Sequence, residues 1–226
     1  MKQKILSETN LVTECFGRLQ KMIIGGALEP GRKLKVEELK GELLVGGSPI
    51  REALSRLVAS GLVEAKDNKG FYVTRISEVD IKDVYWTMFQ IDMLALRQAM
   101  EIGDDAWKSN IVATLYNLGL LENSGGLVEY ADWVERNYAF HVALIAGCNS
   151  ALLMQIRADV YKRFDRYSRM SFNLAQSNLE LNHQEHQEIA EAVLEHDVKR
   201  VYELMHHHVF GALDDVIKAF KERKML

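Results

Sequence analysis

The chain contains 226 residues, 48% of them hydrophobic and 27% charged, a balance typical of a globular protein with one large domain or two small ones. No apolar run approaches the roughly 20 residues that cross a bilayer, and the first residues lack the features of a signal peptide, so we expect no membrane association. Two cysteines, Cys15 and Cys148, are too few for a disulfide framework, which favours a cytoplasmic protein. Because only two prolines occur among many Leu, Ala, Met and Glu residues, the composition predicts a mainly α-helical fold and excludes collagen-like and all-β proteins.

Charge is distributed unevenly along the chain. Residues 1–75 contain 13 Lys and Arg against 9 Asp and Glu, whereas residues 76–226 contain 15 against 23. A basic segment followed by an acidic one suggests two functions, although a difference of this size also arises by chance. Ser77 and Asp80 form a helix-start signal directly after a strand-like segment. We therefore predict one domain over residues 1–75, suited to a polyanion, and a second over residues 76–226.

The first domain is predicted to contain three helices followed by a β-hairpin. Ser48 is expected to cap the third helix and Pro49 to begin it, while Asp67–Gly70 has the composition of a hairpin turn. This order of elements is typical of a winged helix-turn-helix, which places its third helix in the major groove of DNA. In chain order the expected elements are helices at 10–25 and 36–44, a helix from Pro49 that ends at Gly61, and strands at 62–66 and 71–74.

The third helix and its surroundings supply candidates for DNA contact. Arg51 and Arg56 occupy its polar face and can reach bases or phosphates, and the backbone N–H groups at its start can bind a phosphate. Alternatively, Arg51 pairs with Glu52 or Glu42 on a solvated surface, or the winged helix binds another protein. The candidate DNA-binding residues are Lys35, Gly47, Ser48, Arg51, Arg56 and Lys69.

Three segments of this domain carry a family pattern. The sequences of Leu28–Leu34, Pro49–Leu57 and Gly61–Glu64 resemble the DNA-binding domain of the GntR superfamily of bacterial transcription regulators. The resemblance implies a winged helix that binds double-stranded operator DNA. It also reveals two departures, because family members often have a basic residue at the position of Gly47, and some have an arginine at that of Glu37. Base recognition is therefore expected to depend on Arg51, Ser48 and the hairpin.

The second domain is predicted to be an all-helical bundle of six or seven helices, long enough to bury a sizeable core. Short breaks rich in Gly, Asn and Asp separate the amphipathic segments. The expected helices lie at about 78–100, 104–121, 126–147, 150–174, 179–196 and 198–222.

Four polar residues lie on apolar faces of these helices. Asn137 and His141 are i,i+4 neighbours on one face, and His186 and His208 lie in line with apolar residues of two later helices. Burying a polar side chain costs about 1–3 kcal/mol unless it is hydrogen-bonded or ligated. A single inward histidine is usually a satisfied core residue. Three of them in one bundle also suit a shared metal ion, and the spacing alone leaves both interpretations open.

The same residues, in the same order, resemble the FCD domain of the FadR branch of GntR regulators. That resemblance implies a divalent metal, zinc or nickel, held by Asn137, His141, His186 and His208, with a small organic acid bound to the metal as effector. The amide of Asn137 replaces a more common carboxylate, so this site carries one negative charge less. His183 lies one turn before His186 and is expected to contact a ligand rather than the metal.

The second domain also departs from the family pattern at a position that concerns the effector. Family members often place an arginine in the first helix of this domain, at the position of Met88, and a carboxylate effector needs a cationic partner. Arg157 is the candidate, unless its side chain extends along the surface to reach water. The remaining candidates for effector contact are Tyr85, Tyr161 and Tyr167.

These features predict a ligand-responsive transcription regulator, a repressor, that acts as a homodimer on a two-part operator. Two alternatives use the same residues. In the first, the metal itself is the signal. In the second, the three-histidine site is that of a metalloenzyme that activates water, although no carboxylate near the ligand positions has the helical phase of a general base. We expect the protein not to be an enzyme.

Overall fold

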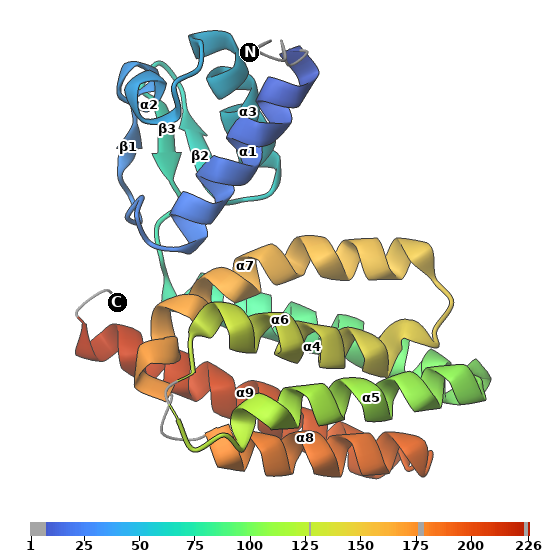
Figure 1. The fold of residues 1–226 in the computed structure, drawn as a ribbon. Coiled ribbons are helices and arrows are strands. Elements are labelled where there is room, and N and C mark those ends of the chain that lie inside the picture. Colours follow the sequence, from blue (N-terminus) through green and yellow to red (C-terminus); the bar gives the residue numbers. More distant parts are fainter. Residues whose placement is uncertain (1–7, 127, 176–178, 224–225) are drawn as a thin grey trace. The chain divides into compact units, whose positions relative to one another are not determined.

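The computed structural model describes residues 8–126, 128–175, 179–223 and 226 (Figure 1). Its contacts divide the chain into two compact units. The first comprises the residues up to Ser77 together with Asp165–Met170, and the second comprises Glu78–Phe164 and the residues from Ser171 onward. The described part holds nine helices and one three-stranded sheet, so the predicted fold class, a winged helix-turn-helix followed by an all-α bundle, is confirmed. None of the described helices is both long and apolar enough to span a membrane.

The first unit is a winged helix. Its sheet has the strand order β1-β3-β2, and all of its pairs are antiparallel. Val63 pairs with Val73 and Lys66 with Gly70, so β2 and β3 form the predicted hairpin. The elements are α1 (Glu8–Ile24), β1 (Lys33–Leu34), α2 (Val36–Leu43), α3 (Gly47–Ala59), β2 (Val63–Lys66) and β3 (Gly70–Val73).

The core of this unit forms between α1, α3 and the hairpin. Ile50, Leu54 and Leu57 of α3 have no exposed surface and pack in one cluster with Leu19 and Ile23 of α1. Burial of each such side chain contributes about 1.5–3 kcal/mol. This burial turns the opposite face of α3, with its charged residues, toward solvent.

The start of α3 differs from the prediction. The helix begins at Gly47 with Gly46 as its N-cap, and no side chain caps it, so the prediction that Ser48 caps the helix is wrong. Pro49 still falls in the first turn, where a missing N–H leaves no helical hydrogen bond unmade. The strand β1 was not predicted, because two residues are too few for an alternating pattern.

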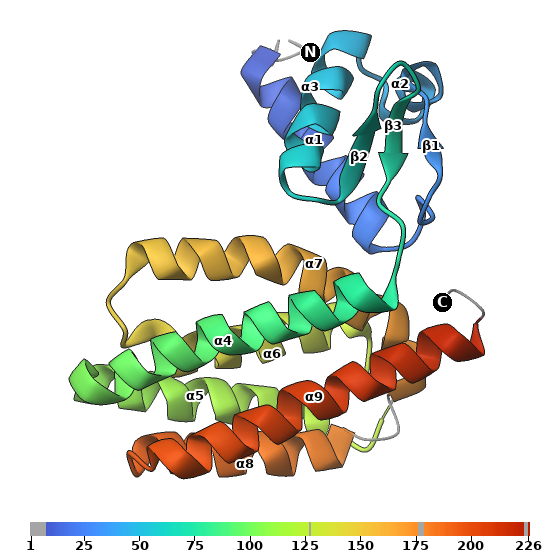
Figure 2. The same ribbon diagram turned by 180° about the vertical axis from the view of Figure 1, so that it is seen from behind.

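The described part of the chain after Ser77 holds six helices, as predicted, and all of them lie in the second unit except for Asp165–Met170. Helix α5 packs against α6 and α8, α4 packs against α6 and α9, and α8 packs against α9 (Figures 1 and 2). The predicted helix from residue 126 begins only at Tyr130. The bounds are α4 (Glu78–Ile102), α5 (Asp105–Glu122), α6 (Tyr130–Ala146), α7 (Ala151–Ala175), α8 (Leu179–Leu194) and α9 (Val198–Glu222).

Trp107 fixes the start of α5 against the end of α6. Asp104 caps α5 by accepting a hydrogen bond from the Trp107 backbone N–H at 2.8 Å, and the indole N–H donates to the carbonyl of Ala143 at 2.9 Å. A Cβ atom at Gly103 would lie 2.1 Å from the indole ring, and one at Gly147 would lie 2.9 Å from it. The two glycines therefore leave the space for the ring, and α6 is held in a defined position within the bundle.

Candidate metal centre and DNA-binding surface

Three histidines from three different helices meet inside the second unit. His141 comes from α6, His186 from α8 and His208 from α9, and each offers a ring nitrogen within 4.8 Å of the other two. The ring centroids of His141 and His186 are 5.3 Å apart, and those of His186 and His208 are 4.8 Å apart. His186 is fully buried, and the other two rings are partly buried. The structure thus brings together all three histidines that the sequence analysis selected.

Two buried polar atoms, one in this cluster and one on the same helix as His141, have no hydrogen-bond partner among the described residues. They are Oδ1 of Asn137, one helical turn before His141, and Nε2 of His186. A buried polar atom without a partner costs about 1–3 kcal/mol, so native proteins rarely keep one without a reason. Imidazole nitrogens with an amide oxygen are a donor set that suits zinc or nickel, and the two unused lone pairs are available as ligand atoms. The residues therefore fit a divalent metal ion.

The protonation of the histidines also suits a metal ion. Burial, followed by the charges of neighbouring histidines, holds the pKa of His141 well below its ordinary value, and the same causes lower the pKa of His186. Both rings are therefore neutral near pH 7. A neutral imidazole keeps one nitrogen lone pair, which is the form that coordinates a metal.

Two carboxylates orient the rings. Glu122, at the end of α5, lies 3.2 Å from Nδ1 of His186, and Glu185 lies 2.6 Å from Nδ1 of His208. With Nδ1 engaged in each case, Nε2 is the nitrogen left for a ligand bond, an arrangement that metal-binding histidines commonly have. This role was not predicted from the sequence for either residue. Glu122 could have been recognised as a buried carboxylate, because it follows Ile111 and Leu118 at helical spacing on the apolar face of α5. Glu185 gives no such signal, because it lies beside the apolar face of α8 and not on it.

Glu122 is the more unusual of the two carboxylates. Burial raises its pKa to about 7, against the opposing effect of hydrogen bonds from the Trp133 indole and from His183. Glu185 is partly exposed, and its hydrogen bond with His208 lowers its pKa. The buried carboxyl group of Glu122 thus contacts two histidines and one indole.

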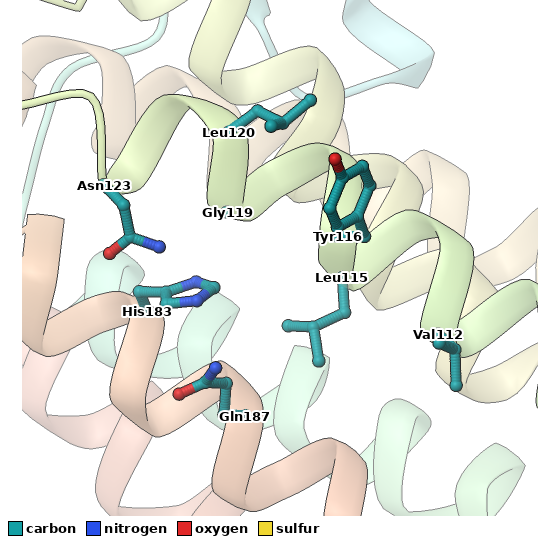
Figure 3. A pocket seen from close by; sticks show the side chains of 8 residues that line it. All are labelled: Val112, Leu115, Tyr116, Gly119, Leu120, Asn123, His183 and Gln187. Carbon is teal, nitrogen blue, oxygen red and sulfur yellow. The ribbon is translucent and has the colours of Figure 1, made fainter.

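His183 was predicted to contact a ligand of the metal, and the structure places it against Glu122, which in turn contacts His186. Its Nδ1 lies 3.2 Å from Glu122, and its ring lies over Gly119, where a Cβ atom would come within 2.6 Å of it. The outer side of this ring faces an open pocket of about 470 Å³ between α5 and α8 (Figure 3). That pocket is lined mainly by apolar residues, and the three clustered histidines are not among them. Of the other histidines, His196, His206 and His207 are exposed.

Arg157 is buried inside the bundle. Its side chain is 2% exposed, so the alternative that it extends along the surface to water is wrong. Its Nε lies 2.6 Å from Oδ1 of Asp92 on α4, and Nη2 lies 3.3 Å from Oδ2, so the pair is bidentate. The third nitrogen, Nη1, is buried without a partner among the described residues. Burial raises the pKa of Asp92, and the charge of Arg157 opposes that shift.

The surroundings of Arg157 distinguish the tyrosine candidates. The guanidinium carbon lies 5.8 Å from the ring of Tyr161 and 5.5 Å from that of Tyr138, a residue that was not predicted. Tyr85 is buried on α4 against Phe164, and Tyr167 is buried in the Asp165–Met170 segment that groups with the first unit. Tyr161 is thus the predicted tyrosine that the structure places beside Arg157.

The candidate DNA-binding residues lie on the surface of the first unit. Ser48 and Arg51 are exposed on α3, and Lys69 is exposed in the hairpin turn. The alternative that Arg51 pairs with a glutamate is not borne out, since among the described residues no carboxylate lies within ion-pair distance of Arg51. Its two predicted partners pair elsewhere, Glu52 with Arg56 at 2.7 Å and Glu42 with Arg32 at 3.7 Å.

Two of the remaining candidates on this surface already form ion pairs. Lys35 forms an ion pair with Glu38 at 2.7 Å, as Arg56 does with Glu52. Exposed ion pairs of this kind contribute only about 0–1 kcal/mol, so either cation can exchange its partner for a phosphate. A Cβ atom at Gly47 would lie 3.5 Å from the guanidinium of Arg51, so a side chain there would stand directly beside it.

Two protein-family models match the chain, one over each of the two predicted domains. The family model described as "Bacterial regulatory proteins, gntR family" matches residues 11–73, and the FCD domain model matches residues 83–210. The chain belongs to the GntR family of bacterial transcription regulators and carries an FCD domain. Members of this family bind operator DNA, and these matches are to regulators and not to enzymes, as predicted.

Individual relatives extend over nearly the whole chain. The transcriptional regulator BphR of Paraburkholderia xenovorans is 32% identical over 221 residues, which cover 96% of this chain and 89% of BphR. The transcriptional repressor GlaR of Escherichia coli is 33% identical over 205 residues, covering 89% of this chain and 93% of GlaR. Among solved structures, McbR/YncC of E. coli has a TM-score of 0.75 at 16% identity over 93% of this chain and 98% of its own, a similarity of fold.

Proposed function

We propose that this GntR regulator is a ligand-responsive repressor, in which the FCD domain binds a divalent metal ion and a small carboxylate effector that modulates operator binding. The observation that carries the proposal is the pair of unused buried lone pairs, one on His186 of the three-histidine cluster and one on Asn137, a helical turn before His141. Asn137, His141, His186 and His208 would hold the ion. When bound, the metal supplies an electrophilic centre with open positions for an anion.

The DNA-binding half of the proposal depends on α3 and the hairpin. Arg51 would reach base edges or phosphates of the major groove, and the N–H groups at Gly47 and Ser48 would receive a phosphate. Lys69 would contact the backbone beside the groove. Because operators of winged helices usually have two half-sites, we propose that the chain acts as a homodimer. The name of the relative GlaR, a repressor, supports repression over activation.

Effector response requires a difference in affinity. An effector that releases DNA must bind the arrangement of helices that is incompetent for DNA more tightly than the competent one. Arg157 and Tyr161 would contribute to that affinity by contacting an anionic group of the effector. If the metal alone sets the arrangement, the chain is a metal sensor, and the same four ligands serve that alternative.

The test begins with the DNA upstream of the protein's own gene. Purified protein is titrated onto this DNA and onto scrambled DNA of equal length, across a salt series. We expect preferential binding to the upstream DNA, with affinity that falls steeply as salt rises. Equal, weak binding to both DNAs would contradict operator recognition at this site.

The second step tests the metal and the effector. Small carboxylates are screened for release of the DNA from zinc-loaded protein, and the double variant His141→Ala/His208→Ala is measured beside the wild type. We expect the variant to lose zinc and effector binding and to keep its affinity for DNA. A full effector response in the variant would refute a metal-dependent mechanism. DNA binding that follows free zinc without any added acid would identify the metal sensor.

A further inference from the structure

Arg157 has one nitrogen that the fold does not use. Asp92 accepts hydrogen bonds from Nε and Nη2, whereas Nη1 is buried and has no partner among the described residues. Because the guanidinium is planar and rigid, binding along its Nε–Nη2 edge fixes the direction in which the Nη1 hydrogens point. Asp92 therefore both pairs the cation and aims its remaining donor.

The open donor and the histidine cluster are two separate places for an anion. The proposed metal ligands are imidazoles and an amide, none of which carries a negative charge, so a bound divalent ion would still attract an anion. Arg157 lies against the rings of Tyr138 and Tyr161, and its hydrogen bonds go to Asp92. Tyr138 belongs to α6, the helix that also carries Asn137 and His141, so the guanidinium packs against the helix that holds two of the proposed ligands.

We propose that the effector is a small acid with two anionic groups, one for the metal and the second for Nη1 of Arg157, and that Asp92 is the positioning residue for this second contact. The inference rests on the proposed function, because it assumes that an acid binds at the metal. A hydrogen bond from a buried arginine to a carboxylate is charge-assisted, and its loss leaves a buried donor unpaired. An acid whose single carboxylate binds the metal would leave Nη1 without a hydrogen-bond partner, as in the unliganded protein.

The experiment compares acids that differ only in the second carboxylate. Zinc-loaded full-length protein is titrated calorimetrically with the unbranched dicarboxylates from malonate to adipate and with the monocarboxylates from propionate to hexanoate. We expect the best dicarboxylate to bind about 10- to 100-fold more tightly than the monocarboxylate of equal length. Equal affinity within each matched pair would overturn the inference.

Variants of the arginine test the assigned contact. In Arg157→Gln we expect the dicarboxylate to lose this advantage, while the monocarboxylate keeps its affinity within about 3-fold. Arg163→Gln, on the same helix but partly exposed and 3.8 Å from Asp80, is the matched control and should change neither affinity. The double variant Asp92→Asn/Arg157→Gln replaces the ion pair with two amides, so it reports the same loss should the single variant fail to fold.

A variant of Asp92 tests positioning. Asp92→Asn keeps the arginine and the size of its partner but weakens the contact that aims it. We expect the ratio of dicarboxylate to monocarboxylate affinity to fall, while zinc affinity stays at the wild-type value. A merely structural role would leave this ratio unchanged, which would overturn the assignment of Asp92.

Two outcomes separate the inference from the proposed function. If Arg157→Gln weakens both classes of acid equally, a single carboxylate reaches both the metal and the arginine, and the two-anion inference is wrong while the proposed function stands. If zinc binds but no acid binds to the wild type, the effector part of the proposed function fails, and the inference fails with it.

Discussion

The two units use the same side chain in opposite ways. Arg51 of the winged helix is exposed and has no ion pair among the described residues, since water solvates its charge. Arg157 of the bundle is 2% exposed and depends on Asp92 for two of its hydrogen bonds. Isolating a charge from water costs several kcal/mol unless a partner replaces the water. A surface cation can therefore be replaced with little loss of stability, whereas the buried polar groups of the bundle contribute both to stability and to the candidate site.

The largest effect that we expect concerns the metal centre. His186→Ala removes the most deeply buried of the three histidines, so zinc affinity should fall by more than the roughly 10- to 100-fold that loss of an outer partner costs. Affinity for DNA without effector should not change, because the winged helix folds around its own core. Competition with a chromophoric chelator measures the first quantity and fluorescence anisotropy the second. Zinc affinity equal to that of the wild type would exclude His186 as a ligand.

A smaller effect is expected from the carboxylate behind that histidine. Glu122→Gln should lower zinc affinity about 10- to 100-fold, since the ring of His186 loses a charged partner. Zinc competition measures this loss against that of His186→Ala. An undiminished affinity would show that Glu122 does not support the metal.

Glu122 also gives a pH dependence that belongs to the bundle. Its pKa is about 7 in the folded protein and 4.5 ordinarily, so its contribution to stability is fully present below about pH 4.5 and is lost as the pH rises through 7. Thermal unfolding of metal-free protein should therefore show Glu122→Gln gaining stability over the wild type as the pH rises from about 4.5 to about 7, by on the order of 3 kcal/mol in full. A constant difference across this range would contradict the raised pKa.

The surface of the winged helix should respond differently. Arg51→Ala is expected to cost about 1–3 kcal/mol of operator affinity and to leave the unfolding temperature and zinc affinity nearly unchanged. Binding to operator and scrambled DNA measures whether specificity falls together with affinity. A marked loss of stability would show that Arg51 is part of the fold.

The smallest effect is expected at the hairpin. Lys69 lies in the exposed turn between β2 and β3. Lys69→Ala should therefore weaken binding to operator and scrambled DNA alike and reduce the slope of log affinity against log salt concentration by about 1. Salt titrations of both DNAs provide the measurement. A change confined to the operator would instead indicate that the hairpin reads sequence.

The sequence predicts the features that local geometry determines, and it does not predict contacts between distant residues. Periodicity placed the helices of both units, and the i,i+4 spacing of Asn137 and His141 marked one face of the cluster, because local geometry determines both. The contact between Arg157 and Asp92 joins residues 65 positions apart, so no local pattern contains it. Asp92 was nevertheless detectable as a carboxylate on the apolar face of α4, four residues after the buried Met88.

Other features were beyond the sequence for different reasons. The N-terminus of α3 was misplaced because Ser48 is a common cap, and the tight backbone at Gly46 and Gly47 gave no competing signal. The roles of Glu122 and Glu185 depend on which helices become neighbours, and this is decided by packing of the whole bundle.

The hydrogen bond from the Trp133 indole to Glu122, at 3.1 Å, has an optical consequence. Glu122 also contacts His186, so a cation held by that histidine changes the electric field at an indole only two contacts away. Emission from Trp133 should therefore report occupancy of the metal centre without a label. The other two tryptophans sit in different surroundings, with Trp86 half exposed and Trp107 buried, and they provide an internal reference within the same molecule.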